Sequence, residues 1–272
     1  TKAALYSLNG ELVAQDSREV PIHYPQPGVV EQDSTDFYSS AAEAVRTCLS
    51  RSGIDPREIA ALACDSQMAG LGLIDADFQP AARFDSWLDM RCEPYIAQME
   101  QRAGQRITEL TGCAPTCDHG PKMLWWQNEE PETWRRAAKV VMPAGYLAGR
   151  LAGLRGEEAF IDPTFLHFSG FQDAQAGGWS AELIDLFALD REKLPRIIEP
   201  WEVIGTLTAA GARDFGLAEG TLIAAGAGDT AANALGAGIV EPGMLFDNAG
   251  TAAVLAACTD TFTADTANRA LL

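Results

Sequence analysis

The sequence predicts an α/β fold in which helices flank a mixed β-sheet. Short apolar runs bounded by turn residues, which are typical of buried strands, alternate along the chain with longer segments of helical spacing. The first two expected strands are joined by Asn9-Gly10, a dipeptide that favours a tight antiparallel hairpin. Strands separated by helices favour parallel pairing, so the sheet should contain pairs of both kinds.

The first part of the chain should supply the hairpin, one long helix and two further strands. Strands are expected at residues 1–8, 11–22, 59–64 and 71–74. Ser34 can cap a helix that turns one apolar face toward the core, formed by Phe37, Ala41, Ala44, Val45 and Cys48. Residues 65–70 form a polar turn that ends in a glycine and joins the last two strands.

The middle of the chain, residues 92–153, is predicted to be mainly helical. Helix ends are expected at Lys122, the Trp125-Trp126 pair and Pro131, and the two tryptophans are expected in the core. After a short strand at residues 140–142, Pro143 fits the first turn of a helix over residues 144–152, which Gly153 closes.

The following segment should contain a loop and two capped helices. Asp162-Pro163 is expected to begin the loop. Ser180 caps one helix, which Leu194-Pro195 should end. A strand at residues 204–207 then leads to Thr208, which caps a helix over residues 209–216.

The composition narrows the classes of partner. The chain has 272 residues, of which 47% are hydrophobic and 21% charged, so it should form one large domain or two domains. Its net charge of −18 argues against nucleic-acid and anionic-membrane partners. The six cysteines form no disulfide framework, and no signal peptide or membrane-spanning apolar run is evident. We therefore expect reduced thiols and a cytoplasmic location.

The strongest functional signal is the stretch over residues 221–238. It opens with an apolar run, residues 221–225, which predicts a buried strand, and Gly226 and Gly228 then allow a tight turn. Asp229 follows where a helix over residues 230–237 should begin. A carboxylate is thus presented at a strand-to-helix turn, where open α/β sheets bind ligands. Taken alone, it fits a helix N-cap as well as a catalytic base.

Two further segments add to this signal. Residues 247–253 form a second glycine turn with a hydroxyl, suited to holding phosphate oxygens through backbone N–H groups. A proton-accepting carboxylate beside a phosphate cradle indicates phosphoryl transfer to a hydroxyl. Residues 84–91 set Trp87 among acids and a base, which suits a sugar site but also fits an amphipathic segment with Trp87 in the core.

Two other kinds of site are disfavoured. Cys113, Cys117 and His119 are zinc-ligand types, but no second Cys/His pair completes four ligands, so we predict loop residues there. Gly226-Ala-Gly228 is also found in dinucleotide-binding oxidoreductases. Here the third glycine is misplaced, and no acid follows at the spacing that ribose recognition needs.

Several segments, in order along the chain, match the motifs of one family. The glycines before Asp229 fit its Gly-x-Gly-Asp segment, residues 66–70 resemble Ser/Ala-Gly-Gln-Met-His-Gly, and residues 87–91 resemble Trp-x-Asp-x-Arg. Further matches in the same register lie at residues 31–33, 121–125, 143–153, 205–208, 216–217 and 250–251. Over nearly its whole length the chain resembles the FGGY family of carbohydrate kinases, and it is xylulokinase-like within that family.

The resemblance implies an actin-like ATPase, ribonuclease-H-like fold and ATP-dependent phosphorylation of a sugar or polyol hydroxyl, with a pentulose favoured. It makes Asp229 the general base. The implied sugar pocket is lined by Gln67, Met68, Ala69, Trp87, Asp89 and Thr230. Gly250 and Thr251 would approach the phosphates of ATP, which Mg²⁺ would bridge, and no protein metal ligand is assigned.

The chain departs from the family pattern in two ways. Ala69 stands where xylulokinases carry His, which removes a polar contact to a ketose and leaves another ketose or a polyol open as substrate. The chain also begins after the family's Asp-x-Gly-Thr phosphate loop. The resemblance then implies an N-terminal, sugar-binding domain over residues 1–240 and a truncated start of the nucleotide-binding domain over residues 241–272. We expect no kinase turnover from this chain alone.

One further class is kept as an alternative, a non-catalytic actin-like module that binds sugar and has lost the chemistry. Asp229 and Gly250-Thr251 argue against it, because a degenerate site would have lost them. The expected partners are a small sugar or polyol and ATP, and a homodimer is one arrangement that the chain could adopt.

Overall fold

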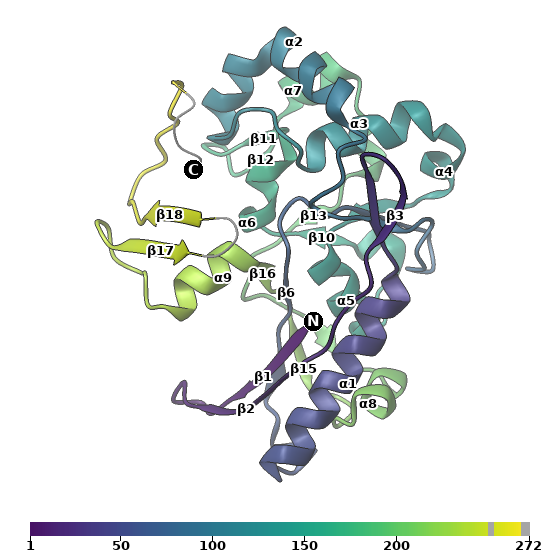
Figure 1. Cartoon of the computed structure of the whole chain (residues 1–272), viewed down its shortest axis with the longest axis vertical. Coiled ribbons are helices and arrows are strands. Elements are labelled where there is room, and N and C mark those ends of the chain that lie inside the picture. The colour runs from purple at the N-terminus through teal and green to yellow at the C-terminus, as the bar shows by residue number, and fades with distance from the viewer. Residues whose placement is uncertain (250–252, 268–272) are drawn as a thin grey trace.

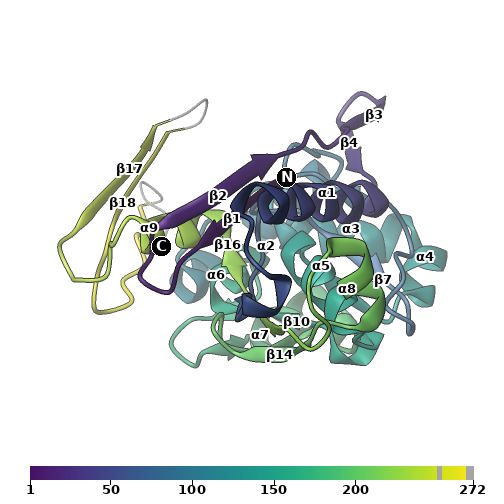
Figure 2. The same ribbon diagram turned by 90° about the horizontal axis from the view of Figure 1, so that it is seen from below.

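The computed structural model describes residues 1–249 and 253–267. Short strands run through the middle of the molecule and helices surround them, as Figures 1 and 2 show. The predicted mixture of strand directions is confirmed, because parallel and antiparallel pairs both occur among the described residues. It is divided into several small groups of two or three strands. No described helix combines the length and the apolar character that crossing a bilayer would require.

The N-terminal hairpin and the first helix follow the sequence pattern. Strands β1 (Lys2–Tyr6) and β2 (Leu12–Ser17) pair antiparallel, and helix α1 (Ser34–Ser52) packs against both. The prediction that Ser34 caps α1 was wrong by one residue. Asp33 is the N-cap, because its backbone is extended and its carboxylate accepts a hydrogen bond from the Thr35 N–H at 3.0 Å.

The sheet that precedes the candidate site has strand β15 (Leu222–Ala224) at its centre. This strand pairs antiparallel with β14 (Val203–Thr206) and parallel with β5 (Ala61–Leu62). A few residues further on, β16 (Ala227–Gly228) pairs parallel with β6 (Asp65–Ser66). The same two segments therefore run side by side through both pairs.

The register between these segments changes by one residue at Gly226. Ile223 lies opposite Leu62 and Ala227 opposite Asp65, so residues 224–226 face residues 63–64. Gly226 has φ +83°, and a Cβ placed on it would lie 1.8 Å from the Cys64 carbonyl oxygen. This extra residue is a β-bulge, a device that redirects the side chains that follow it.

We expect Gly226→Ala to lower the free energy of unfolding by roughly 2 kcal/mol or more, since it adds a clash to a left-handed backbone. Gly220→Ala is the matched control: Gly220 also has positive φ, at +87°, but a Cβ there meets nothing within 4 Å. Urea unfolding of the two variants measures the difference. Equal losses would show that the close approach at Cys64 contributes nothing.

The remaining strands are short. They are β3 (His23–Gln26), β4 (Val29–Gln32), β7 (Gly72–Ile74), β8 (Phe84–Asp85), β9 (Lys139–Val141), β10 (Phe160–Ile161), β11 (Gln172–Asp173), β12 (Gly178–Trp179) and β13 (Arg196–Ile197). Strand β4 pairs with β3 and β8, and β7 pairs with β9. Parallel pairing recurs between β10 and β13.

Helices cover the strands at both ends of the molecule, as Figure 1 shows. They are α2 (Glu93–Thr111), α3 (His119–Glu129), α4 (Pro131–Arg136), α5 (Pro143–Ala152), α6 (Pro163–Leu166), α7 (Ala181–Phe187) and α8 (Ala209–Phe215). Single 3₁₀ turns lie at η1 (Pro56–Glu58), η2 (Gly156–Glu158), η3 (His167–Ser169) and η4 (Arg191–Lys193). The caps predicted at Ser180, Thr208 and Gly153 are confirmed.

Three further helix assignments differ from the sequence prediction. Lys122 and the Trp125-Trp126 pair lie inside α3 rather than at a helix end. Asp162 caps the short helix α6, where a loop was expected, since Pro163 occupies the first helical position. Helix α7 already ends at Phe187, where Ala188 takes a left-handed conformation, rather than at Leu194-Pro195.

Helix α9 (Asp229–Gly236) follows β16 directly and leads to the hairpin of β17 (Leu245–Ala249) and β18 (Ala253–Ala257). Figure 2 shows this hairpin standing to one side of the helical body. The largest group of buried apolar residues lies elsewhere, between β7, β9 and helices α2, α3 and α7. A second group fills the space between α1, α5, α8 and β15.

Candidate functional site

Asp229 is the first residue of α9, and capping does not account for its carboxylate. The N-cap of α9 is Gly228, which forms no side-chain cap. The Asp229 side chain is partly buried, and burial raises the pKa of its carboxyl above the ordinary range. The neighbouring Thr230 hydroxyl donates a hydrogen bond to this carboxylate at 3.3 Å.

A second carboxylate, which was not predicted as a site residue, lies near the first. Because β6 and β16 pair in parallel, Asp65 lies opposite Ala227, two residues before Asp229. Burial raises the pKa of the Asp65 carboxyl, the Asp229 charge raises it further, and the nearby Lys2 lowers it. The sequence places Asp65 and Asp229 far apart, so only the strand pairing brings their charges together.

The turn before Asp229 is held by α6. The backbone N–H of Gly228 donates to the Thr164 hydroxyl at 2.7 Å, and this hydroxyl donates to the Asp162 carboxylate. Asp162 and Thr164 were not predicted as site residues. The sequence did indicate a helix start at this position, because an Asp followed by Pro is typical of a helix start and not only of a loop.

The predicted sugar-site residues Gln67 and Trp87 are brought together by the fold. The Gln67 side-chain amide donates to Gln32 Oε1 at 2.6 Å, and its Oε1 accepts from the Trp87 backbone N–H at 3.4 Å. The Trp87 side chain itself is 52% exposed, so the alternative that placed it in the core was wrong. Met68 lies over the turn before Asp229, since a Cβ on Gly228 would be 2.3 Å from its sulfur.

Asp89 directly follows the turn at residues 87–88, here called the Trp87 turn, and has no exposed surface. Its carboxylate accepts from the Val30 N–H at 2.7 Å and forms an ion pair with Arg91 at 2.8 Å. Arg91 also reaches Glu31 at 2.9 Å. These bonds favour a role for Asp89 in holding the shape of the Trp87 turn.

Lys122 connects the two loops that carry the predicted sugar-site residues. Its side chain is fully buried, and its ammonium donates to the carbonyl oxygens of Ala69 and Ser86, each at 2.7 Å. Ala69 has φ +58°, a left-handed conformation that is uncommon for alanine. The buried Lys122 ammonium therefore holds the Ala69 loop and the Ser86 loop together through its two hydrogen bonds.

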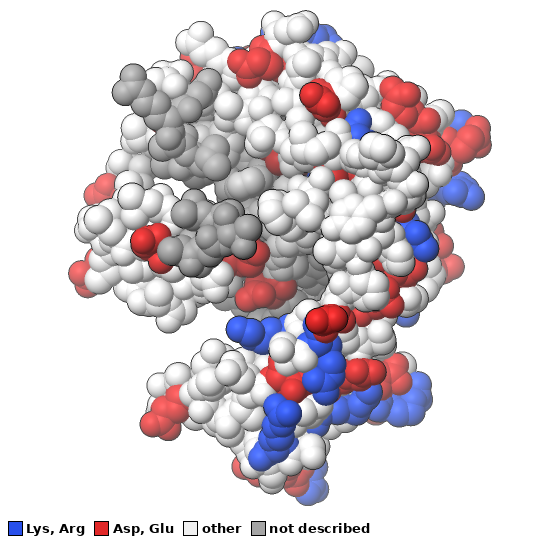
Figure 3. All heavy atoms as spheres, viewed as in Figure 1, with Lys and Arg blue, Asp and Glu red and all other residues white. Residues whose placement is uncertain are grey.

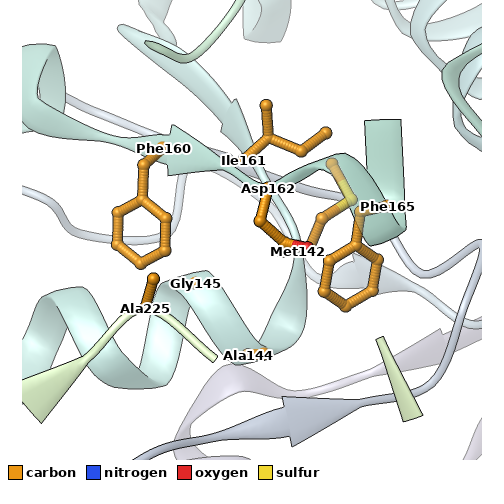
Figure 4. Close-up of a pocket in the computed structure, with 8 residues that line it drawn as sticks. All are labelled: Met142, Ala144, Gly145, Phe160, Ile161, Asp162, Phe165 and Ala225. Atoms are coloured by element: carbon orange, nitrogen blue, oxygen red, sulfur yellow. The ribbon is translucent and has the colours of Figure 1, made fainter. Parts of the chain in front are cut away.

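Figure 4 shows a small apolar gap between side chains in the interior. Its lining residues are Met142, Ala144, Gly145, Phe160, Ile161, Asp162, Phe165 and Ala225. The Phe160 ring points toward Ala225, and none of the predicted site residues lines the gap. The gap has no room for a water molecule, so it is a packing gap and not a sugar pocket.

Charged side chains lie on both sides of a notch in the face of the molecule drawn in Figure 3. Figure 3 shows this notch between the part that carries the β1–β2 hairpin and the part that carries α9, with basic and acidic side chains on its two sides.

Gly250 and Thr251, which were predicted to approach ATP phosphates, lie outside the described residues. Within the described ranges, no three His, Cys, Asp or Glu side chains are grouped as a metal site requires.

Comparison with known proteins matches residues 1–236 to the N-terminal domain of the FGGY family of carbohydrate kinases. The chain is 32% identical over 259 residues to a xylulose kinase of Lactococcus lactis, covering 94% of this chain and 50% of that protein. It is 27% identical over 250 residues to an autoinducer-2 kinase of Klebsiella pneumoniae, covering 89% of this chain and 46% of that protein.

Solved structures agree with these matches. A xylulose kinase of Rhodospirillum rubrum superposes with a TM-score of 0.89 at 24% identity, covering 97% of this chain and 54% of that one. This likeness confirms the actin-like fold that the sequence implied. The chain spans about half the length of the curated relatives that it matches. With a family match over residues 1–236, the chain belongs to the FGGY family of carbohydrate kinases.

Proposed function

We propose that the chain forms the sugar-binding part of a kinase that transfers the terminal phosphoryl group of ATP to a hydroxyl of a sugar or polyol. In this proposal residues 1–240 are the sugar-binding domain and residues 241–272 begin the nucleotide-binding domain. The family match, which ends at residue 236, supports this division.

The observation that carries the proposal is the position of Asp229. Its carboxylate starts α9 without capping it, and it lies beside the loop that carries Gln67 and Met68. We assign Asp229 the role of general base. It accepts the hydroxyl proton late, as the oxygen bonds to phosphorus, so its carboxylate need not be strongly basic. The raised pKa of this carboxyl is compatible with the role.

The favoured substrate is a pentulose such as xylulose. The exposed Trp87 side chain offers an aromatic face to sugar C–H groups. The Gln67 amide uses one N–H to hold Gln32, which leaves its second N–H for a sugar hydroxyl. Ala69 presents only a methyl group where xylulokinases carry His. This substitution keeps another ketose or a polyol as the alternative substrate.

The nucleotide is proposed to bind as MgATP, with Gly250 and Thr251 approaching its phosphates through backbone N–H groups. A net charge of −18 repels ATP at long range, so close contacts and the magnesium charge must hold it.

The proposal is tested by a substrate screen of the whole protein that carries this chain. Release of ADP is followed with MgATP over a panel of pentuloses, hexuloses and polyols. We expect turnover above the ATPase background with at least one pentulose. Sugar binding without any ADP release across the panel would favour the non-catalytic module instead.

We expect Trp87→Ala to weaken sugar binding roughly tenfold, because the stacking face is lost, and to leave ATP binding nearly unchanged. Calorimetric titration with D-xylulose and with MgATP measures the two affinities separately. Trp201→Ala is the matched control, since Trp201 is also exposed, at 76%, but lies outside the predicted pocket. A greater loss of ATP affinity than of sugar affinity would contradict the assignment.

A further inference from the structure

Two cysteines from separate segments are in contact next to Asp89, at the end of the Trp87 turn. Cys92 lies after this turn, is the N-cap of α2 and is fully buried. Cys117 lies just before α3 and is partly exposed. Their sulfur atoms are 3.9 Å apart, and the Cys117 thiol also contacts the backbone carbonyl of Asp89. Phosphoryl transfer requires neither thiol.

The surroundings make Cys117 the more reactive of the two. A hydrogen bond from the Cys92 thiol lowers the pKa of Cys117 to about 7 against the effect of burial, and the Lys122 ammonium acts in the same direction as this bond. Asp89 and Asp85 oppose the lowering with their negative charges. The pKa of Cys92 is raised, so this residue stays a thiol.

Two other cysteines have the opposite character. Burial raises the pKa of the Cys64 thiol to about 12, and it raises the pKa of Cys48 as well. The Cys48 thiol donates to the Ala3 carbonyl oxygen at 3.4 Å and not to another sulfur. Among these four cysteines, oxidation should therefore fall on the pair of Cys117 and Cys92.

We propose that Cys92 and Cys117 form a modification site, a dithiol that a peroxide oxidises to a disulfide. The Cys117 sulfur attacks one peroxide oxygen, the O–O bond breaks, and a sulfenic acid and one water form. The Cys92 sulfur then attacks the Cys117 sulfur, displacing the hydroxyl, which leaves as water with the Cys92 proton. Overall, two thiols lose two electrons and one peroxide is reduced to two waters.

The disulfide acts on the Trp87 turn. It shortens the distance between the sulfur atoms from 3.9 Å to about 2 Å and removes the thiol contact to Asp89, whose carboxylate holds the turn. It also ties the end of this turn to the segment before α3. Oxidation should therefore weaken sugar binding, and this second step rests on the proposed function.

The chemistry is tested on the whole protein that carries this chain, treated with hydrogen peroxide at neutral pH and digested for mass mapping. We expect a peptide pair joined through Cys92 and Cys117, reversed by dithiothreitol, with Cys48 and Cys64 unmodified. Oxidation spread evenly over the cysteines, or sulfinic acid at Cys117 without the disulfide, would overturn the proposal. This mapping requires no variant, so it stands even if a substituted protein fails to fold.

Two variants and a binding measurement complete the test. In Cys92→Ser, the Cys117 sulfenic acid should persist and react with dimedone, whereas Cys117→Ser should leave Cys92 unoxidised. Oxidised wild-type protein should bind D-xylulose roughly threefold or more weakly than reduced protein, and Cys48→Ser should behave as the wild type. A disulfide that leaves the affinity unchanged would refute the effect on the turn without touching the thiol chemistry. If neither form binds any sugar of the panel, the proposed function fails while the mapping result stands.

Discussion

Asp229→Asn is expected to lower turnover by roughly 10²- to 10⁴-fold while sugar affinity stays nearly constant, because Asn keeps the size of the side chain and one acceptor oxygen but cannot accept the proton. The substitution should not unfold α9, since Gly228 rather than Asp229 is its N-cap. Steady-state kinetics with the sugar identified by the screen measures turnover, and calorimetry measures affinity. A kcat that falls with no change in sugar affinity separates a catalytic role from a binding role.

Asp65→Asn is the control that this site offers. Asp65 lies close enough to Asp229 for the two charges to interact, yet its β6 position sets it in a different segment. We expect Asp65→Asn to affect turnover far less than Asp229→Asn. The reverse ranking would identify Asp65 as the base, and unchanged turnover in both variants would remove the carboxylates from the chemistry.

Lys122→Met is expected to destabilise the folded protein strongly. The side chain keeps its apolar length, but the buried carbonyl oxygens of Ala69 and Ser86 lose their donor. Buried Asp85 and Asp118 also lose the positive charge that lowers their pKa values. We expect the free energy of unfolding to fall by roughly 4 kcal/mol at pH 8, which is typical of a broken buried charge network.

The loss should depend on pH. Burial raises the pKa of Asp85 to about 7, against the lowering effects of Arg91 and Lys122. A raised carboxyl pKa favours folding at low pH, and this contribution is lost as the pH rises through about 7. Without Lys122 the ionised carboxylate is still less tolerated, so the loss should shrink to roughly 2 kcal/mol at pH 6, where Asp85 is mostly protonated.

Urea unfolding of wild type and variant at pH 6 and pH 8 checks both the size and the pH dependence. Lys139→Met is the matched control, because the Lys139 ammonium is only partly buried and donates to one carbonyl, that of Leu194, at 3.0 Å. Lys139→Met should lower the free energy of unfolding by about 1 kcal/mol or less at both pH values. Equal losses in the two variants would show that Lys122 does not hold the two loops together.

Local features were predicted well because their causes lie within a few residues. The Asn9-Gly10 hairpin and the helix ends at Thr208 and Gly153 follow from turn and cap preferences that act over single turns. Local errors arose where neighbouring residues compete for one role. At the start of α1, Asp33 and Ser34 can both cap, and the extended backbone of Asp33 decides between them.

The candidate site was predicted in its residue types more than in its arrangement. Asp229, Gln67 and Trp87 were named because a carboxylate after a glycine turn, an amide and an aromatic face have recognisable chemistry. The interactions that hold these residues in place could not be predicted in the same way. Lys122 was interpreted as a helix end, since no local pattern reveals that its ammonium will reach carbonyls 36 and 53 residues away.

The sequence by itself determined the α/β class, the hairpin, most helix caps, the family and the carboxylate on which the proposed chemistry depends. Only the tertiary structure decided the bulge at Gly226, the proximity of Asp65 to Asp229, the bridge made by Lys122 and the contact of Cys92 with Cys117. The physical reason is the range of the interactions. Caps and turns satisfy backbone groups within one turn of chain, whereas pairing register and buried charge contacts join segments that only the packed fold brings together.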